Sequence, residues 1–324
     1  MIRWGIAGPG IIANKFAAAI KNVEDAELYA VASRSEERGI EFAEKYGVKT
    51  VHTGYESMAN DPLVDAVYVS TPHPFHLPLA RLFLEKGKHV LCEKPMTVNA
   101  AEARELARVA KENNVFLMEA MWSRFLPAVK EAVRIAKSGE LGEIRSVSAD
   151  FCYLLGKDED NKLLIDSMAG GSLLDVGVYC LHFADLVLGR KPKTVSASAR
   201  VSGGVDLSAD MLLTYPSGAT ARLSSAMDHS KQSSGYIYGN LGYIFLPNFY
   251  KAREFYICKN GEERRVKMPP IGDGFEEEII EVCRCVAEGK TESDTLPPSV
   301  TIEMMELMDA IRKQIGVVYP FEKM

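Results

Sequence analysis

The sequence lacks the features that define several large classes of protein. Its formal net charge is -6, whereas a general nucleic-acid binder needs a basic surface to meet phosphate. No uninterrupted apolar run reaches the roughly 18 residues that a membrane span requires. The first residues, MIRWGIAGPG, lack the apolar segment and the cleavage site of a secretory signal. These absences predict a cytoplasmic protein whose partners are small molecules, with no nucleic-acid or membrane partner.

Cysteine is also sparse in the sequence. The chain has six cysteines in 324 residues, scattered in a way that does not suit a disulfide scaffold. The one close pair, Cys283 and Cys285, has a single intervening residue and no further Cys or His at zinc-finger spacing. We therefore expect buried free thiols and no metal site.

The length and the amino-acid composition of the chain indicate two globular domains. Hydrophobic residues make up 47% and charged residues 25% of a chain of 324 residues, which is long enough for two cores. The pattern of elements changes near residue 121. We predict a first domain over residues 1–121 and a second domain over residues 122–324.

The first domain alternates short apolar strands with amphipathic helices. Apolar runs predict strands at residues 2–7, 28–33, 64–70, 89–92 and 115–118, and helical spacing follows the first two at residues 11–20 and 36–46. Continuous apolar strands that alternate with helices are typical of a parallel sheet covered on both faces. The predicted fold is an α/β, doubly wound Rossmann domain.

The second domain has a different pattern. Residues 125–137, 172–188 and 300–315 have helical spacing, and period-2 stretches separated by Gly, Pro and Asn predict strands at residues 195–201, 210–215, 220–227, 235–238, 243–246 and 254–258. Short turns between consecutive strands favour antiparallel pairing. This part is predicted to be an α+β domain with a large, mostly antiparallel sheet.

The turn after the first strand has the sequence GPGIIA, at residues 8–13. In a G-x-G-x-x-A turn, Gly8 allows a tight bend, Gly10 leaves room for a pyrophosphate, and Ala13 lets the helix lie close to the strand. The helix N-terminus then offers free amides and a positive dipole to that group. We predict a dinucleotide site whose contacts include Gly8, Gly10, Ile11 and Ile12.

The end of the second strand favours NADP over NAD. An NAD site usually has a carboxylate at this point, which accepts a hydrogen bond from the ribose 2′-hydroxyl. Here Ser33 and Arg34 occupy the strand end, and Arg38 follows one turn later. A hydroxyl and guanidinium groups suit a 2′-phosphate, although the two arginines are also compatible with an ordinary solvated helix start.

Two further loops are expected to face the cofactor, because ligands bind beyond the carboxyl ends of the strands in open α/β sheets. The candidate cofactor contacts there are Thr71, Pro72, His73 and His76 after the predicted strand at residues 64–70, and Glu93 and Lys94 after the predicted strand at residues 89–92. Polar packing at a helix start is the alternative for the two histidines. A lysine at such a strand end can hold a substrate hydroxyl or lower the pKa of a neighbouring acid.

An ordered set of motifs resembles the glucose–fructose oxidoreductase/inositol dehydrogenase (Gfo/Idh/MocA) family. Besides the turn at 8–10, the set comprises TPH at 71–73, EKP at 93–95, EAMWSRF at 119–125, GGSLLDVGVY at 170–179 and IRKQIGV at 311–317. The resemblance extends over almost the whole chain. It points most closely to the branch that oxidises dihydrodiols or, with NADP, aldoses.

The resemblance implies roles for particular residues. Lys94 matches the family's catalytic lysine, and Asp175 and Tyr179 match its Asp-x-Gly-x-His element, with Tyr in place of His as in the dihydrodiol and sugar branch. The tyrosine disfavours the substrates of the His-bearing inositol dehydrogenases. Trp122 and Arg124 are expected to line the pocket near the nicotinamide. The family also implies a homodimer or homotetramer formed through the sheet of the second domain.

The residues themselves agree with part of this assignment. Asp175 and Tyr179 share one face of a helix, and His182, which we expect to be a packed polar residue, lies on the same side. A phenol with its ordinary pKa near 10 accepts a proton near neutrality only if an adjacent cation stabilises its anion, which is the role assigned to Lys94. The alternative for Tyr179 is a packed tyrosine.

The resulting hypothesis is hydride transfer between a sugar, polyol or diol hydroxyl carbon and NADP, with NAD less favoured. Tyr179 would act as the acid/base, Lys94 would assist it, and Asp175 would orient the substrate or the pair. Two alternatives remain: a reductase of an unsaturated C–N or tetrapyrrole substrate, and a non-catalytic NADP-binding sensor. The polar segment 157–168 is read either as a mobile lid or as a surface loop.

Overall fold

The computed structural model describes residues 1–156 and 162–322. The chain divides into two compact units, each of which is formed by two stretches of sequence. The first unit comprises Met1–Trp122 and Ile271–Ile302, and the second comprises Ser123–Pro270 and Glu303–Met324. The segment 157–161, which is part of the predicted lid or surface loop, lies outside the described residues.

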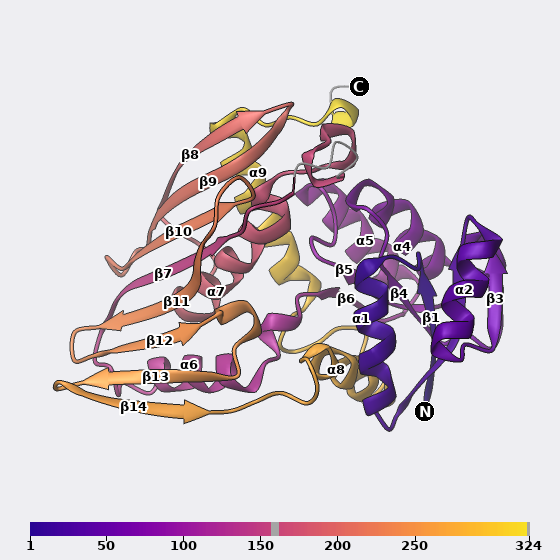
Figure 1. The fold of residues 1–324 in the computed structure, drawn as a ribbon, viewed down its shortest axis with the longest axis horizontal. Coiled ribbons are helices and arrows are strands. Elements are labelled where there is room, and N and C mark those ends of the chain that lie inside the picture. Colours follow the sequence, from indigo (N-terminus) through magenta and orange to yellow (C-terminus); the bar gives the residue numbers. More distant parts are fainter. Residues whose placement is uncertain (157–161, 323–324) are drawn as a thin grey trace. The chain divides into compact units, whose positions relative to one another are not determined.

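The first unit is built on a six-stranded sheet whose strand order is β3-β2-β1-β4-β5-β6 (Figure 1). Every pairing in this sheet is parallel. Such an order with all strands parallel is that of a Rossmann domain, which confirms the predicted fold class. Its strands are β1 (Ile2–Ala7), β2 (Ala26–Ser33), β3 (Thr50–Thr53), β4 (Ala66–Val69), β5 (His89–Glu93) and β6 (Leu117–Ala120).

Helices follow the strands of this sheet in sequence, as a doubly wound fold requires. They are α1 (Ile11–Ala19), α2 (Glu36–Tyr46), α3 (Tyr55–Ala59), α4 (His76–Glu85), α5 (Ala100–Glu112) and, from the second stretch of sequence, α8 (Phe275–Ala287). The helix α1 packs with α8, and α4 packs with α5. Between α1 and the sheet lies an aromatic core in which Phe16 stacks on Tyr68, with 4.0 Å between the ring centroids, and meets Trp4 edge-on.

Residues 271–302 lie within the first unit, whereas our prediction assigned them to the second domain. Lys15 pairs with Asp273 at 3.2 Å, and the Asn22 amide donates to Glu276 at 2.7 Å, so α8 is joined to the α1 region. The Leu117 N–H donates to the Thr291 carbonyl at 3.2 Å. These bonds link residues that are far apart in the sequence, which is why local patterns gave no sign of them.

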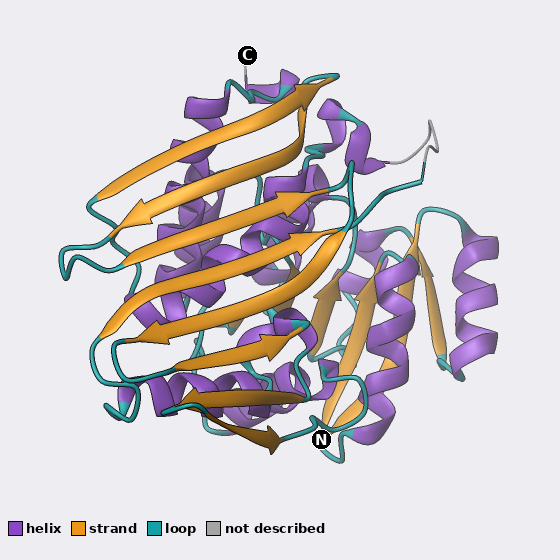
Figure 2. Cartoon of the chain, turned by 60° about the vertical axis from the view of Figure 1, so that its left-hand side comes forward, coloured by secondary structure: helices purple, strands orange, loops and turns teal. Residues whose placement is uncertain are grey.

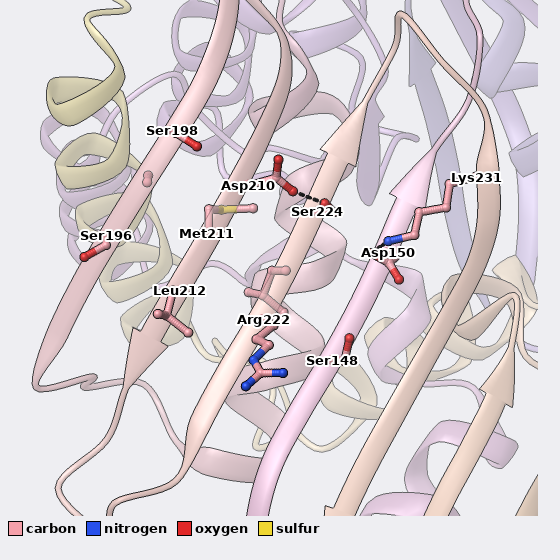
Figure 3. Close-up of a pocket in the computed structure, with 12 residues that line it drawn as sticks. Ser148, Asp150, Ser196, Ser198, Asp210, Met211, Leu212, Arg222, Ser224 and Lys231 are labelled. Atoms are coloured by element: carbon pink, nitrogen blue, oxygen red, sulfur yellow. Dashed lines mark hydrogen bonds and ion pairs between the residues drawn. The ribbon is translucent and has the colours of Figure 1, made fainter.

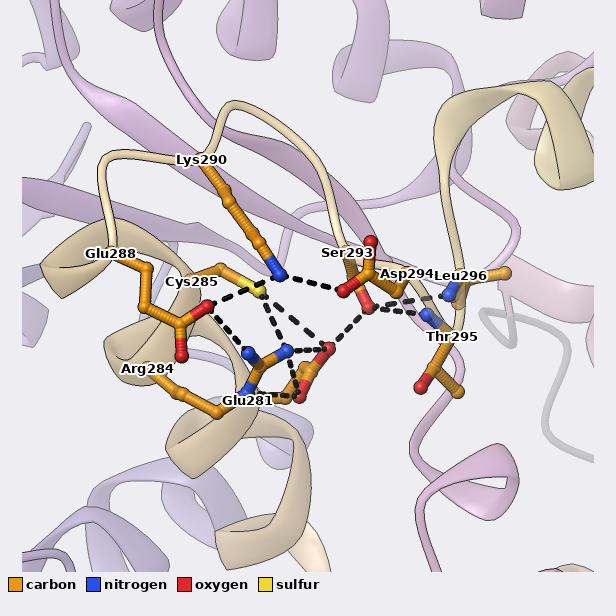
Figure 4. A network of polar contacts seen from close by, with 9 residues as sticks. All are labelled: Glu281, Arg284, Cys285, Glu288, Lys290, Ser293, Asp294, Thr295 and Leu296. Atoms are coloured by element: carbon orange, nitrogen blue, oxygen red, sulfur yellow. Dashed lines mark hydrogen bonds and ion pairs between the residues drawn. The ribbon is translucent and has the colours of Figure 1, made fainter.

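A polar network fastens the loop after α8 onto that helix (Figure 4). The Ser293 hydroxyl donates to the Glu281 carboxylate at 2.5 Å and accepts from the Thr295 N–H at 3.0 Å. Arg284 holds Glu281 on the same helix at 3.0 Å. The network therefore fixes the path of the chain from α8 to the start of α9 (Pro298–Ile315).

The second unit is built on an eight-stranded sheet with the order β14-β13-β12-β11-β7-β10-β9-β8 (Figure 2). Only β7 and β10 pair in parallel among the described residues, so the sheet is mostly antiparallel, as predicted. Its strands are β7 (Ile144–Cys152), β8 (Thr194–Ser202), β9 (Val205–Thr214), β10 (Thr220–Ala226), β11 (Lys231–Gly239), β12 (Tyr243–Pro247), β13 (Glu254–Lys259) and β14 (Glu262–Lys267).

Helices pack on one face of this large sheet. They are α6 (Pro127–Lys137), a π-helical turn (Leu173–Gly177) and α7 (Val178–Leu188), with the later part of α9 also in this unit. The predicted helix at 172–188 is therefore a π-helical turn followed by an α-helix. Among the described residues, Asp166–Leu188 is the one stretch long and apolar enough to cross a membrane, and 78% of its apolar window is buried inside the structure. Such burial is usual for a core helix.

Candidate active site

The turn after β1 has the geometry that a dinucleotide site needs. Gly8 has φ +95°, and a Cβ there would lie 2.9 Å from the Thr71 side chain. Gly10 precedes α1, no side chain caps this helix, and its first turn carries no acidic residue. The first helical residue, Ile11, is 93% exposed. The first-turn amides of α1 are thus open to an anionic group, as the pyrophosphate of a dinucleotide would require.

The loop after β4 approaches the same turn. The Ser70 hydroxyl donates to the Gly8 carbonyl at 2.9 Å. The neighbouring Thr71 hydroxyl is buried and makes no hydrogen bond to any residue in the described parts of the chain. A buried hydroxyl beside an uncapped helix start is a polar group that a bound cofactor can satisfy. The residues present therefore fit a dinucleotide at this turn.

Cationic side chains lie at the end of β2. Ser33 is buried, and its hydroxyl accepts from the Ser35 N–H at 3.2 Å. The Arg34 guanidinium lies 5.6 Å from the centroid of the Phe75 ring, and Arg38 donates to the Pro9 carbonyl at 3.4 Å. Burial raises the pKa of Tyr55, while Arg34 and Arg38 act in the opposite direction. The predicted residues therefore gather beside the glycine turn.

Tyr55 is a neighbour of these arginines that the sequence did not reveal. It begins α3, directly after β3. Neither element has a signal in the pattern of apolar residues, because β3 contains only four residues and none of them is fully buried. An aromatic residue so close to two cations adds a flat surface to the candidate adenosine end of the site.

Three side chains clamp the backbone around Lys94. The Lys94 N–H donates to the Glu93 carboxylate at 3.0 Å, and the Met96 N–H donates to Glu119 at 3.0 Å. His76 lies 2.9 Å from the Pro95 carbonyl through Nδ1 and 2.7 Å from the Thr71 carbonyl through Nε2. Burial lowers the pKa of His76, while the Thr71 and Pro95 carbonyls act in the opposite direction, and the ring joins the two loops. The clamp fixes the path of the chain at Lys94.

The two carboxyl groups of this clamp are buried, and a third buried carboxyl group lies near them. Glu93 accepts from the Tyr68 hydroxyl, and Glu119 accepts from the Thr301 hydroxyl at 3.0 Å. Burial raises the pKa of Glu93, while the Lys94 cation acts against this effect. Glu278 on α8 is fully buried, and burial together with Glu93 and Glu119 raises the pKa of its carboxyl well above the ordinary value. Among these acids, Glu93 is the one whose ionised form the Lys94 cation favours.

The second unit carries the other candidate catalytic residues on the helix that begins at Leu173. Asp175 lies in the π-helical turn, and its carboxylate accepts from the Tyr153 hydroxyl at 2.8 Å. Burial, followed by the charge of Asp175, raises the pKa of Tyr153, which therefore stays a neutral donor. π-Helical turns inside helices are frequent at functional sites.

Tyr179 lies one turn further along the same helix. It is 6% exposed, with its ring centroid 5.5 Å from that of Phe151 and 5.9 Å from that of Tyr250. Phe151 and Tyr250 stack on each other at 3.9 Å. The aromatic neighbours hold the Tyr179 ring in one place and surround it with apolar surface.

Trp122, Arg124 and His182 are placed by packing. The Trp122 ring stacks on Phe275 at 4.8 Å. Arg124 is buried, pairs with Asp185 at 2.5 Å and lies 2.9 Å from Nδ1 of His182. His182 is therefore the packed polar residue that we expected. Cofactor contacts by Trp122 and Arg124 remain a prediction.

The predicted site residues thus fall into two groups. Those at the glycine turn, at the end of β2 and in the clamp belong to the first unit, whereas Asp175 and Tyr179 belong to the second. The contact between Lys94 and Tyr179 remains a prediction from the resemblance. Within residues 1–156 and 162–322, no group of three or more His, Cys, Asp and Glu side chains is arranged to hold a metal ion.

Comparison with known proteins identifies the family. Residues 2–121 match the oxidoreductase family with an NAD-binding Rossmann fold, and residues 129–245 match the GFO/IDH/MocA C-terminal domain. The fold and the turn after β1 thus define an oxidoreductase with a dinucleotide-binding domain. The chain belongs to the Gfo/Idh/MocA family, which confirms the resemblance seen in the sequence.

Relatives with assigned activities match the chain over its full length. Trans-1,2-dihydrobenzene-1,2-diol dehydrogenase from Mus musculus is 35% identical, and the match covers 99% of each chain. The same enzyme from Homo sapiens is 34% identical with equal coverage.

Solved structures of related enzymes also match. KijD10, a 3-ketoreductase from Actinomadura kijaniata in complex with NADP and TDP-benzene, is 29% identical with a TM-score of 0.89, covering 97% of this chain and 98% of that one. Aldose–aldose oxidoreductase from Caulobacter crescentus, complexed with glycerol, is 25% identical with a TM-score of 0.89 and 97% coverage of both chains.

Proposed function

We propose that this chain is an NADP-dependent oxidoreductase that acts on a hydroxyl carbon of a sugar, a polyol or a trans-dihydrodiol. The observation that carries the proposal is the joint presence of the clamped Lys94 and of Asp175 and Tyr179 on one helix. A protein that only bound the dinucleotide would need none of the three. Full-length similarity to dihydrodiol dehydrogenases supports the same substrate class.

Ser33 and Arg34 would select NADP. The end of β2 presents a hydroxyl and a guanidinium where an NAD site usually presents a carboxylate. A guanidinium forms charge-assisted hydrogen bonds with a phosphate, and Arg34 also offers a flat surface for stacking. The NADP complexes of KijD10 support this choice.

The cofactor would supply a hydride acceptor or donor at C4 of its nicotinamide. Tyr179 would take the proton of the substrate hydroxyl during oxidation and return it during reduction. Because an ordinary phenol has a pKa near 10, Lys94 would stabilise the phenolate with its positive charge. Asp175, held by the Tyr153 hydroxyl, would orient the substrate hydroxyl or the Tyr–Lys pair.

A substrate panel tests the proposal. The purified protein should produce NADPH, seen as an increase in absorbance, with at least one member of a panel of aldoses and trans-dihydrodiols. The rate with NAD should be lower, because NAD lacks the 2′-phosphate that Arg34 would bind. Binding of NADP without turnover on any member of the panel would favour the sensor alternative.

We also propose that a second copy of the chain covers the outer face of the eight-stranded sheet. Mostly polar residues, with Met211 and Leu212 among the apolar ones, line a hollow of about 550 Å³ on this face (Figure 3). Beside the hollow, strand register aligns Tyr236 with Phe245, whose rings stack at 4.7 Å, and Tyr238 with Tyr243. Aromatic residues on an open sheet face are typical of an interface.

Replacing exposed aromatic residues on this face with charged ones tests the proposed assembly. The double variant Tyr238→Lys/Tyr243→Lys should be monomeric by light scattering after gel filtration, whereas the wild type should be a dimer or tetramer. Two copies in contact would bring the new lysines close together in a symmetric interface. Val318→Lys changes an exposed apolar residue outside the sheet and should leave the assembly intact. A monomeric wild type would refute the proposal.

A further inference from the structure

A buried carboxylate from a distant strand holds the start of the helix that carries Asp175 and Tyr179. Asp206, near the beginning of β9, is 0% exposed. Its Oδ2 atom accepts from the Leu173 N–H at 2.7 Å and from the Ser172 hydroxyl at 2.8 Å. Leu173 is the first residue of the π-helical turn, so Asp206 satisfies an amide that the helix itself leaves without a partner.

The backbone in front of this turn is shaped to admit the carboxylate. Gly171 has φ +125°, and a Cβ at this position would lie 2.3 Å from Oδ1 of Asp206. The Gly171 carbonyl accepts from the Asp175 N–H at 3.2 Å. Gly171, which lies against Asp206, is therefore joined to the backbone of Asp175 by one hydrogen bond.

Two other contacts hold the same segment. The Ser172 hydroxyl lies 3.0 Å from the Ser225 hydroxyl on β10, and the Tyr319 hydroxyl donates to the Gly170 carbonyl at 2.8 Å. A Cβ on Gly177, at the other end of the π-helical turn, would lie 3.1 Å from the Ser225 hydroxyl. The helix start is thus fixed from β9, from β10 and from the segment after α9.

Keeping this carboxylate ionised costs stability at neutral pH. Burial raises the pKa of Asp206 to about 6, although Ser172, Leu173 and Arg312 act in the opposite direction. Tyr319 also interacts with Asp206 electrostatically, Arg312 is itself paired with Asp309 and Glu322, and Asp166 lies beside Gly204, two residues before Asp206. With a folded pKa above its ordinary value of 3.8, Asp206 favours the folded state at low pH, and this contribution is lost as the pH rises through about 6.

We propose that Asp206 is a positioning residue that fixes the first turn of the Leu173–Leu188 helix and thereby sets the direction of Asp175 and Tyr179. This inference rests on the proposed function of those two residues. A displacement of about 1 Å at a reacting group can lower the rate by about 100-fold. The ionised Asp206 carboxylate opposes folding at neutral pH, and proteins keep such destabilising groups mainly where function requires them.

Two substitutions separate positioning from general stability. Asp206→Ala removes both hydrogen bonds and should lower kcat by about 100-fold, while the Kd for NADP, measured by fluorescence titration, should not change. Asp206→Asn can place its amide oxygen at the Oδ2 position and keep both bonds, so its kcat should stay near that of the wild type. Its unfolding temperature should equal or exceed that of the wild type at pH 7, and this difference should shrink towards pH 4.

Ser225→Ala is the graded comparison, because it removes a contact of Ser172 and leaves the bond from the Leu173 N–H to Asp206 in place. Its kcat should fall less than that of Asp206→Ala. If Asp206→Ala does not fold, Ser172→Ala removes one of the two donors and should lower kcat in the same direction by a smaller factor. If Asp206→Ala folds and its kcat equals that of the wild type, the proposal is overturned; if it does not fold, an unchanged kcat in Ser172→Ala overturns it. A loss of kcat in Asp206→Asn equal to that in Asp206→Ala would also overturn the proposal.

Deuterium exchange provides a measurement that does not depend on turnover. Peptides covering residues 171–180 should exchange faster in Asp206→Ala than in the wild type, and at the wild-type rate in Asp206→Asn. Equal rates in all three proteins would overturn the positioning role even if the wild type is active. A wild type that turns over no substrate would count against the proposed function alone, and the exchange rates would still decide the role of Asp206.

Discussion

Replacing Tyr179 with phenylalanine should lower kcat by about 10²- to 10⁴-fold, which is the usual contribution of a positioned acid/base. The variant keeps the ring that packs against Phe151 and Tyr250 and loses only the hydroxyl. The Kd for NADP should not change, because the residues predicted to bind the dinucleotide at the glycine turn and at the end of β2 belong to the other unit. Initial rates of NADPH formation at saturating substrate measure the effect.

Tyr250→Phe is the matched control for this substitution. Tyr250 lies against Tyr179 and stacks on Phe151, so the same chemical change is made beside the proposed base. Its kcat should stay close to that of the wild type. Turnover by Tyr179→Phe equal to that of the wild type would show that another group moves the proton, whereas equal losses in both variants would point to a packing effect.

The Rossmann domain was predictable because its signals are local. The main strands of the parallel sheet consist mostly of apolar residues, and the turn at Gly8 requires a positive φ that the sequence meets with glycine. The same holds for Ser33 and Arg34, which end or directly follow a predicted strand. The role of a residue can be predicted from the sequence when it depends only on residues next to it in the chain.

The strands that were missed have weak local signals. The inward residues of β7 include Val147 and Ala149, which are small, and serines alternate with them. β14 has the sequence EERRVK and is mostly exposed at the edge of the sheet, where charged side chains protect against pairing with another chain. Neither strand has the apolar alternation by which the other strands were predicted, and tertiary pairing alone defines them.

In the candidate site, too, the residues within sequence motifs were predicted, whereas their hydrogen-bond partners from distant segments were not. The sequence predicted Lys94, Asp175 and Tyr179 from the motifs that contain them. It did not predict that Glu119 holds the backbone after Lys94, or that Asp206 holds the helix start before Asp175. Both partners come from other strands, so their roles depend on the way the sheets bring distant segments together.

The cofactor preference should reverse when the end of β2 is made to resemble an NAD site. In the double variant Ser33→Asp/Arg34→Ala, the new carboxylate would repel a 2′-phosphate and accept from a ribose hydroxyl, and the guanidinium would be absent. A hydrogen bond to a charged group contributes about 1.5–3 kcal/mol, so the loss of Arg34 alone corresponds to an affinity about 10- to 100-fold lower for NADP. Titration with NADP and with NAD, followed by fluorescence, measures both affinities.

Lys49→Ala controls for the removal of a surface cation. Lys49 is exposed and pairs with Glu27 at 2.5 Å, and it lies just before β3 in the same unit. Its loss should leave both affinities unchanged at physiological ionic strength, because screening weakens the effect of a distant exposed charge. If the double variant kept the wild-type affinity for NADP, Ser33 and Arg34 would not be the phosphate site, and Arg38 would be the next residue to replace. A lower affinity for NADP with a higher one for NAD would place the 2′-phosphate at the end of β2.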